Sequence, residues 1–176
     1  MSNCKYLTTD TIKEHLHELR AGDAVYLSGT VYCARDAVHK KIDTLIREGK
    51  KLPFVIKDSI IYYCGPTPAK PGMAIGSCGP TTSSRMDGFM ETLLDMGLIA
   101  TIGKGGRSKQ VNDAMKKHGA VYLCAMGGAG AISASCIKSV EVIAFEELGC
   151  ESCKKMVFDK FPLVVGNDIY GSSLFD

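Results

Sequence analysis

The feature that most constrains the fold of this chain is an alternation of apolar runs, glycine-containing breaks and helical patterns between residues 12 and 124. Runs rich in β-branched and aromatic residues predict strands, and apolar positions three or four residues apart predict helices. The predicted strands cover residues 24–32, 60–64, 98–102 and 120–124. The predicted helices cover residues 12–19, 35–46, 83–96 and 109–118. This alternation indicates an α/β fold in which helices flank a sheet.

The chain becomes strand-rich from Ile137 onward. Residues 137–145 predict one strand, and the dipeptide Phe161-Pro162 divides two more, at 155–159 and 163–165. Strands on both flanks of the alternating middle predict a mixed sheet. A length of 176 residues fits a single domain over residues 1–176, with residues 1–21 as an N-terminal helical segment.

The composition excludes several classes of protein. A net charge of +2 gives no broad basic field for nucleic acid. No apolar run approaches the roughly 20 residues that span a bilayer, so no membrane partner is expected. Residues 1–6 lack the apolar core of a signal peptide, and a cytoplasmic location is therefore predicted.

The eight cysteines are scattered along the chain. Several lie in apolar strand-like runs, such as Cys124 within residues 122–125, where a cysteine acts as a small buried hydrophobe. Free thiols in a reducing compartment are the simpler interpretation. The pair Cys150 and Cys153 leaves a metal or redox role open, although the second half of a zinc site is missing.

Residues 76–87 combine small residues, hydroxyl side chains and Arg85. The apolar run 73–75 before them predicts the end of a strand, and the pattern 83–96 after them predicts a helix. Free N–H groups and the positive dipole end of a helix N-terminus favour an anion. Arg85 in the first helical turn opposes that dipole, and a bound anion would relieve the conflict. We therefore expect an anion-binding turn here.

Three glycine-containing breaks that follow apolar runs each deliver a cation: Arg35, Arg85 and Lys104. Ligands of α/β folds sit at the carboxyl ends of the strands. Two arginines and a lysine that meet there would suit a small dicarboxylate, because an arginine fork pairs bidentately with a carboxylate and lysine adds a compact charge. Alternatively, the three cations are separate, solvated surface residues.

Several neighbours of these cations have two interpretations. On composition alone, Thr81 and Thr82 are helix caps rather than catalysts. His39 lies one helical turn after Arg35 and either faces the same site or packs as an ordinary histidine. Asp36 and Asp87 each follow an arginine closely and are candidates to orient its guanidinium.

Taken in this order, the motifs resemble the β subunit of class I, iron–sulfur-dependent fumarate hydratase. The resemblance extends from about Gly22 to Phe175, and the β subunit of L-tartrate dehydratase shares much the same pattern. Its most specific part is Gly79-Pro80-Thr81-Thr82 with Arg85-Met86-Asp87. The other matching segments are Leu27-Ser28-Gly29-Thr30, Ala34-Arg35-Asp36 with His39, and Gly103-Lys104-Gly105-Gly106-Arg107-Ser108.

The resemblance implies a swivelling β/β/α domain and a hydro-lyase that reversibly adds water to fumarate to give L-malate. It assigns substrate binding to Arg35, Arg85 and Lys104, and the role of catalytic base to Thr81. A threonine hydroxyl is a poor base at neutral pH, because its pKa lies far from 7. Either Arg85 or Lys104 must therefore stabilise its alkoxide, or Thr81 must relay the proton.

The resemblance also implies that this chain supplies half of a site. The family holds a [4Fe-4S] cluster through three cysteines of the α subunit, so no metal ligand is assigned to this chain. The expected partners are a fumarase α subunit and a small dicarboxylate, in a higher-order hetero-oligomer, with a homo-oligomer as an option for the isolated chain. Two other functions stay open: the β subunit of L-tartrate dehydratase, and a non-catalytic module that binds small dicarboxylates.

Overall fold

The structure is a computed structural model and describes residues 4–175. Its strands are β1 (Lys5–Thr8), β2 (Ala24–Cys33), β3 (Ile60–Tyr62), β4 (Ala100–Gly103), β5 (Val121–Cys124), β6 (Ile137–Ala144) and β7 (Cys153–Asn167). Its α-helices are α1 (Ile12–His15), α2 (Asp36–Arg47), α3 (Asp87–Asp95), α4 (Lys109–His118) and α5 (Gly130–Ser135). Its 3-10 segments are η1 (Leu16–Glu18), η2 (Ser83–Met86) and η3 (Glu146–Glu151). Within this range no helix combines the length and the apolar character needed to cross a membrane.

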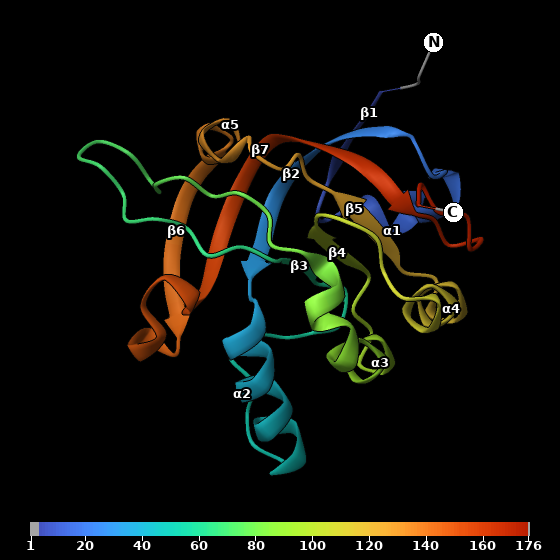
Figure 1. The fold of residues 1–176 in the computed structure, drawn as a ribbon, viewed down its shortest axis with the longest axis horizontal. Helices are drawn as coiled ribbons and strands as arrows, with labels where there is room; N and C mark the ends of the chain where they lie inside the picture. The colour runs from blue at the N-terminus through green and yellow to red at the C-terminus, as the bar shows by residue number, and fades with distance from the viewer. Residues whose placement is uncertain (1–3, 176) are drawn as a thin grey trace.

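Five of the strands close into a barrel. The seven-stranded sheet has the order β1-β2-β3-β4-β5-β7-β6, and β2 also pairs with β7. Strands β2, β3, β4 and β5 run parallel, while β7 is antiparallel to both β2 and β5. Figure 1 shows β7 and β2 side by side across the middle of the molecule. The predicted α/β fold with a mixed sheet is confirmed.

The barrel wall separates two hydrophobic clusters. Ile60 and Tyr62 of β3 belong to the inner cluster, and Ile61 and Tyr63 belong to the outer one. Helices α2, α3 and α4 cover the outer cluster (Figure 1). A strand that is buried on both faces has a continuous apolar sequence. This explains why residues 60–64 carry a strong strand signal.

Strand β7 is continuous, so the predicted division at Phe161-Pro162 is wrong. The backbone kinks at Lys160, which has a positive φ of 50° and whose N–H donates to Ser28 Oγ at 2.9 Å. The pairing of β2 with β7 shifts register next to this point, between Leu27 and Gly29. A bulge of this kind lets a strand turn through a kink and resume pairing. The first half of β7 thus pairs with β6 and the second half with β5.

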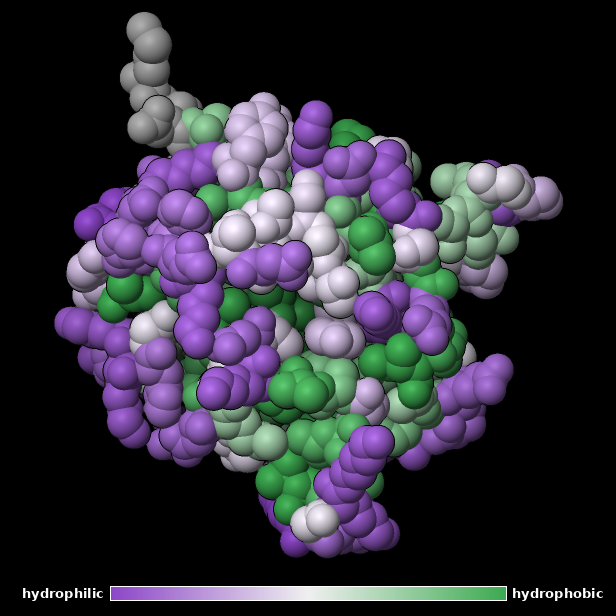
Figure 2. Space-filling view, turned by 180° about the vertical axis from the view of Figure 1, so that it is seen from behind, coloured by the Kyte–Doolittle hydropathy of each residue, from purple (hydrophilic) through white to green (hydrophobic). Residues whose placement is uncertain are grey.

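Residues 65–79 form an arm without helix or strand, so the strand end predicted at residues 73–75 is wrong. The arm projects from the body beside β6 and α5 (Figure 1), and it stands out again at the right of the space-filling view (Figure 2). Its tip, residues 67–74, is exposed, whereas its base at Ile75, Gly76 and Cys78 is buried. Glycine is needed at Gly76, because a Cβ there would overlap with the backbone of Thr67 and Pro68.

The N-terminal segment contains more than the predicted helix. Within residues 1–21, of which 1–3 lie outside the described range, α1 and η1 are preceded by β1, which pairs in parallel with β2. Helix α5 is a second element without a prediction. The helix predicted at residues 83–96 begins as the 3-10 segment η2 and continues as α3, so Arg85 lies in a 3-10 turn.

Candidate active site

The predicted cations gather at the edge where the parallel strands end. Arg35 follows the last residue of β2 by two positions, and Lys104 follows β4 directly. Residues 80–85 cross the same edge, since Pro80 pairs with Cys64 after β3 and Thr82 pairs with Lys104. Strand β3 separates β2 from β4, so the ends of these two strands lie about 10 Å apart. Long side chains span that distance from both sides.

Thr81 and Lys104 are held together by backbone hydrogen bonds. The N–H of Thr81 donates to Tyr63 O at 2.7 Å, the N–H of Lys104 donates to Thr81 O at 3.2 Å, and the N–H of Ser83 donates to Lys104 O at 2.9 Å. Gly103 permits this approach, because a Cβ there would overlap with Ser83 Oγ and lie 2.9 Å from the Tyr63 ring. The glycine-containing break that carries Arg85 and the one that carries Lys104 therefore meet in the fold, as predicted.

Arg35 and Arg85 are joined by Asp36. Arg35 Nε donates to Asp36 Oδ2 at 3.1 Å, and Arg85 Nε donates to Asp36 Oδ1 at 2.8 Å. Burial raises the pKa of Asp36, but its own backbone N–H and the two arginines outweigh burial and hold the pKa below its ordinary value. Asp36 is therefore ionised at neutral pH and orients both guanidinium groups, as one interpretation of the sequence predicts.

A second carboxylate on Arg35 comes from Glu151, which the sequence motifs do not indicate. Arg35 Nη2 lies 3.3 Å from Glu151 Oε1, and the two side chains are 20% and 29% exposed. Glu151 ends η3, and the buried Lys154 holds this segment by donating to Cys150 O at 2.9 Å and to Ser152 Oγ at 2.7 Å. Glu151 lies more than a hundred residues from Arg35, so no local spacing could have linked them.

Arg85 and Lys104 remain available to a ligand. The Arg85 side chain is 52% exposed even though it pairs with Asp36. Lys104 is exposed, makes no ion pair within residues 4–175, and its aliphatic part lies over Gly127. Thr81 is half-buried beside it. The edge thus offers two accessible cations and a hydroxyl, next to an arginine that is fixed from two sides.

His39 does not join this edge. Its Nδ1 lies 3.1 Å from the backbone oxygen of Arg35, and its ring packs against Tyr63 and Phe89. Burial lowers the pKa of His39 to about 4, so the ring is neutral at pH 7. Of its two interpretations, the packing role is confirmed and the site role is wrong.

Asp87 orients a different arginine from the one expected. It accepts hydrogen bonds from Arg107 Nε at 2.7 Å and from the backbone N–H of Ser108 at 2.8 Å. Arg107 is buried and also donates to the hydroxyls of Tyr63 and Thr101. The pair Asp87–Arg107 therefore fixes the turn after β4 to α3. Thr82 holds the N-cap position of η2, but without a side-chain cap hydrogen bond, so its predicted capping role is wrong.

The two cysteines that left a metal or redox role open lie in different surroundings. Cys150 is exposed, whereas Cys153 is buried, and burial raises its pKa to about 12. Residues 4–175 contain no group of three or more His, Cys, Asp or Glu side chains that could hold a metal ion. Neither Cys150 nor Cys153 therefore belongs to such a group within these residues.

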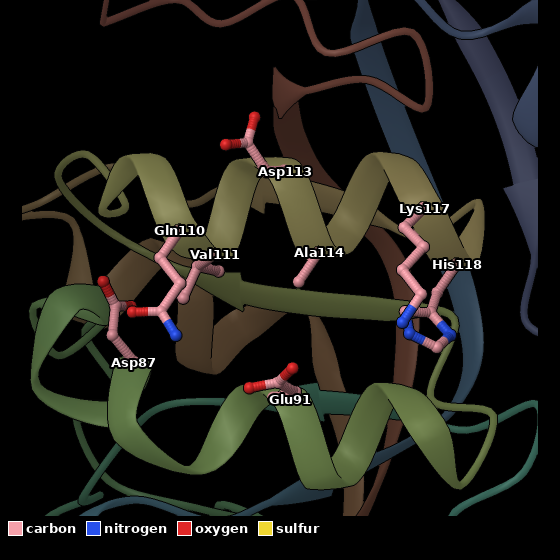
Figure 3. A pocket seen from close by; sticks show the side chains of 8 residues that line it. All are labelled: Asp87, Glu91, Gln110, Val111, Asp113, Ala114, Lys117 and His118. Atoms are coloured by element: carbon pink, nitrogen blue, oxygen red, sulfur yellow. The ribbon is translucent and has the colours of Figure 1, made fainter.

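A separate cavity of about 240 Å³ lies between α3 and α4 (Figure 3). Asp87 lines one end, Lys117 and His118 line the other, and Glu91 points into it from α3. None of Arg35, Thr81, Arg85 and Lys104 lines this cavity. It belongs to the helical layer and not to the strand edge where the predicted residues meet.

Known proteins match this chain along nearly its whole length. A model of the family described as Fumarase C-terminus matches residues 3–176. "Fumarate hydratase 2" of Leishmania major is 42% identical over 172 residues, which are 94% of this chain and 30% of that protein. "Fumarate hydratase class I, anaerobic" of Escherichia coli is 42% identical over 151 residues, 85% of this chain and 28% of that protein.

A third relative is similar in length to this chain. "Putative L(+)-tartrate dehydratase subunit beta" of Methanocaldococcus jannaschii is 36% identical over 178 residues, 98% of this chain and 91% of that protein. The chain therefore spans under a third of the two fumarate hydratases but nearly all of this subunit. Because the family model covers almost every residue, the chain belongs to the Fumarase C-terminus family.

Proposed function

We propose that this chain is the β subunit of a class I fumarate hydratase, a hydro-lyase that reversibly converts fumarate and water to L-malate. The observation that carries the proposal is the meeting of three cations and one threonine at one strand edge. Asp36 joins Arg35 to Arg85, and backbone hydrogen bonds join Thr81 to Lys104. The names of the fumarate hydratases that match this chain support the same activity.

The edge suits a small dicarboxylate. Arg85 in η2 and Lys104 after β4 are exposed cations from different segments, so each is placed to bind one carboxylate. An arginine fork matches a carboxylate in two hydrogen bonds, and lysine adds a compact charge. Arg35 is held by Asp36 and Glu151, which leaves less of its guanidinium free. We assign it to fixing the position of the ligand.

Thr81 is proposed to move the proton of the reaction. Its backbone is fixed to Tyr63 and Lys104, so its hydroxyl stays at the strand edge. An alkoxide needs nearby positive charge, and Lys104 is its closest cationic neighbour along these hydrogen bonds. Thr81 therefore acts as the base with Lys104 as its electrostatic partner, or it relays the proton to a group beyond this chain.

The rest of the site is proposed to come from a partner α subunit in a hetero-oligomer. The fumarate hydratases that match this chain carry more than twice its length in addition. We assign the role of the partner to a chain equivalent to this additional part. A [4Fe-4S] cluster bound there would supply a Lewis acid for the substrate hydroxyl and carboxylate. A cytoplasmic location remains a prediction from the sequence.

Dehydration of L-tartrate is the second candidate. The relative that carries this name is a separate subunit of nearly the same length as this chain. The two reactions differ in one hydroxyl of the substrate, and the same strand edge would bind both. A non-catalytic dicarboxylate-binding module is the third candidate, and it would bind the ligand without a partner.

Anaerobic reconstitution with the α subunit tests the proposal. The reconstituted assembly should hydrate fumarate, and Thr81→Ala should lower kcat by about 10²–10⁴-fold, the usual contribution of a positioned acid or base. Arg85→Ala should raise KM, while Arg47→Ala serves as a matched control, because Arg47 is exposed on α2 and pairs only with Asp43.

Three results would overturn or redirect the proposal. Full activity of the Arg85→Ala assembly would remove the role of the strand edge. Inert fumarate with dehydrated L-tartrate would favour the second candidate. Fumarate binding by the chain alone, with no activity after the α subunit is added, would favour the binding module.

A further inference from the structure

Three cysteine sulfurs meet beneath the strand edge. Cys33 Sγ lies 3.2 Å from Cys64 Sγ, and Cys78 Sγ lies 3.1 Å from Cys64 Sγ. Cys33 is the last residue of β2, Cys64 is the second residue after β3, and Cys78 lies at the base of the arm. Each is at most 1% exposed. The sulfurs therefore form one buried thiol cluster with Cys64 in the middle.

The spacing of the thiol cluster favours a sulfur–sulfur bond over a metal. Thiolates around a tetrahedral zinc ion, with Zn–S of about 2.3 Å, lie roughly 3.8 Å apart. The observed sulfur–sulfur distances of 3.1 and 3.2 Å are shorter than this. In addition, no group of side chains within residues 4–175, this cluster included, has an arrangement that could hold a metal ion. A disulfide, with an S–S bond of about 2.05 Å, needs the sulfurs to approach by little more than 1 Å.

The surroundings assign different roles to the first two thiols. The side-chain hydrogen bond that Cys33 and Cys64 share is the largest influence on the pKa of Cys33 and lowers it, burial opposes this effect, and the charges of Lys154 and Arg35 lower the pKa further. Lys154 lies opposite Cys33 in the pairing of β2 with β7. Burial raises the pKa of Cys64 well above its ordinary value. Because the cations Lys154 and Arg35 both lie on the Cys33 side of the pair, we assign the nucleophile to Cys33 and the resolving thiol to Cys64.

We propose that Cys33 and Cys64 form an oxidative modification site that takes a hydroperoxide and closes to a disulfide. The Cys33 thiolate attacks one peroxide oxygen, the O–O bond breaks, and the other oxygen leaves as hydroxide and takes up a proton. Cys33 becomes a sulfenic acid as the peroxide is reduced by two electrons. The Cys64 sulfur then displaces the sulfenic hydroxyl, which leaves as water with the Cys64 proton.

The arm provides the route to the buried sulfurs. Cys78 lies at its base and is tied to the body by a hydrogen bond from its N–H to Gly130 O at 3.0 Å. Residues 67–74 beyond the base are exposed. Exposed segments with few tertiary contacts open at low free energy. Opening of the arm uncovers the cluster to a reagent as small as hydrogen peroxide.

The disulfide would act on the proposed active site, and this part rests on the proposed function. Cys33 precedes Arg35 by two residues, and Cys64 pairs with Pro80, the neighbour of Thr81. Drawing the two sulfurs together displaces the segments that carry Arg35 and Thr81. A misplacement of about 1 Å at reacting groups lowers activity by about 10²-fold.

Mass spectrometry of the isolated chain tests the modification. The reduced chain is treated with equimolar hydrogen peroxide, blocked with N-ethylmaleimide under denaturing conditions and digested without reductant. We expect a linked peptide pair that contains Cys33 and Cys64 and disappears with dithiothreitol. The exposed Cys4 and Cys150 report general oxidation in the same sample. Oxidation confined to these two, with Cys33 and Cys64 fully blocked by maleimide, would overturn the proposal.

Two variants distinguish a change in the thiol chemistry from a loss of the fold. Cys78→Ala should still form the Cys33–Cys64 link, whereas Cys64→Ala should leave Cys33 as a sulfenic acid that dimedone traps. Circular dichroism shows whether both variants retain the fold. A Cys64–Cys78 link in the unmodified chain would overturn the assigned pair.

Activity measurements separate the modification from the proposed function. The chain is oxidised alone, freed of peroxide and only then mixed anaerobically with the α subunit, so the cluster never meets the oxidant. We expect about 10²-fold lower fumarate hydration, restored by reducing the chain before mixing, and no loss for oxidised Cys64→Ala. A disulfide with full activity would overturn the effect on the site. An inactive reduced assembly would instead overturn the proposed function and leave the mass-spectrometric result standing.

Discussion

Asp36 and Asp87 each begin a helix and each hold an arginine, yet the two centres differ in burial. Asp87, at the start of α3, binds Arg107, whose side chain is 0% exposed. Asp36, at the start of α2, binds Arg85, whose side chain is 52% exposed. A carboxylate in the first turn complements the helix dipole in both cases. Only at Asp36 does the arginine also face solvent.

This difference separates a structural clamp from the proposed binding site. The charge of Arg107 is surrounded by Asp87 and by the hydroxyls of Tyr63 and Thr101, so no partner can be exchanged without exposing a buried charge. Arg85 keeps its Nε hydrogen bond to Asp36, and the rest of its guanidinium is free to bind a ligand. The residue types are the same in both centres, and burial decides what they do.

The largest expected effect is the loss of the buried clamp. Arg107→Met should lower the free energy of unfolding by about 3–5 kcal/mol, because it leaves Asp87 ionised and without its main partner. Arg85→Met should lower it by less than about 1 kcal/mol, since an exposed ion pair stabilises little. Urea denaturation of both variants measures the contrast. Equal losses would contradict the distinction between the two centres.

Acid should destabilise the folded chain through His39, which packs against Tyr63 next to the clamp. Burial lowers the pKa of His39 from 6.5 to about 4, so between these values the unfolded chain binds more protons than the folded chain. The free energy of unfolding should therefore fall as pH drops from about 6.5 to about 4, by about 3 kcal/mol in total. Asp36, whose pKa is lowered below 3.8, loses its contribution only at still lower pH.

Denaturation curves across this pH range check the role of His39. His39→Leu should remove most of the slope between pH 6.5 and 4, and His17→Leu should keep it, because His17 is exposed. A slope that survives in His39→Leu would assign the acid sensitivity to other groups.

Local sequence pattern is sufficient for most of the parallel part of the fold. The predicted helix 109–118 agrees with α4, whose start is fixed by Ser108, which accepts from the N–H of Val111, and whose end is fixed by Gly119 with a positive φ. Barrel closure could not be predicted in the same way. It depends on the pairing of β2 with β7, which joins residues more than a hundred positions apart. The residues around Lys160 likewise give no local signal of a bulge, whereas Pro162 by itself predicts a break between two strands.

The meeting of the four predicted residues at one edge follows from their sequence positions, but their pairings do not. Arg35, Arg85, Lys104 and Thr81 follow strand ends or glycine-containing breaks, and such positions meet at one edge of a parallel sheet. Nearness in sequence suggests Asp87 for Arg85, but the first residue of a helix can face away from its chain neighbour. Asp87 faces Arg107, and Asp36 takes Arg85 instead.

Lys104, the other exposed cation of the proposed site, should contribute to activity and not to stability. Lys104→Ala should lower kcat/KM for fumarate by about tenfold, as expected when one charged hydrogen bond of about 1.5 kcal/mol is removed. Its free energy of unfolding should stay within about 0.5 kcal/mol, the usual range for surface substitutions. Lys109→Ala is the matched control, because Lys109 is exposed and pairs only with Asp113. A similar activity loss in Lys109→Ala would point to general surface charge.

The smallest expected effect concerns Glu151, which makes Arg35 intermediate between the two centres. Glu151→Ala should raise KM about fivefold, because Arg35 loses a partly exposed ion pair of about 1 kcal/mol and its guanidinium becomes less fixed. Glu151→Gln should recover most of this loss, since the amide oxygen still accepts from Arg35 Nη2. Glu147→Ala, in the same 3-10 segment, should leave KM unchanged because Glu147 pairs with Lys41. If Glu151→Gln raised KM as much as Glu151→Ala, charge rather than orientation would be the contribution of Glu151, and Arg35 would belong with Arg85 among the exchangeable cations.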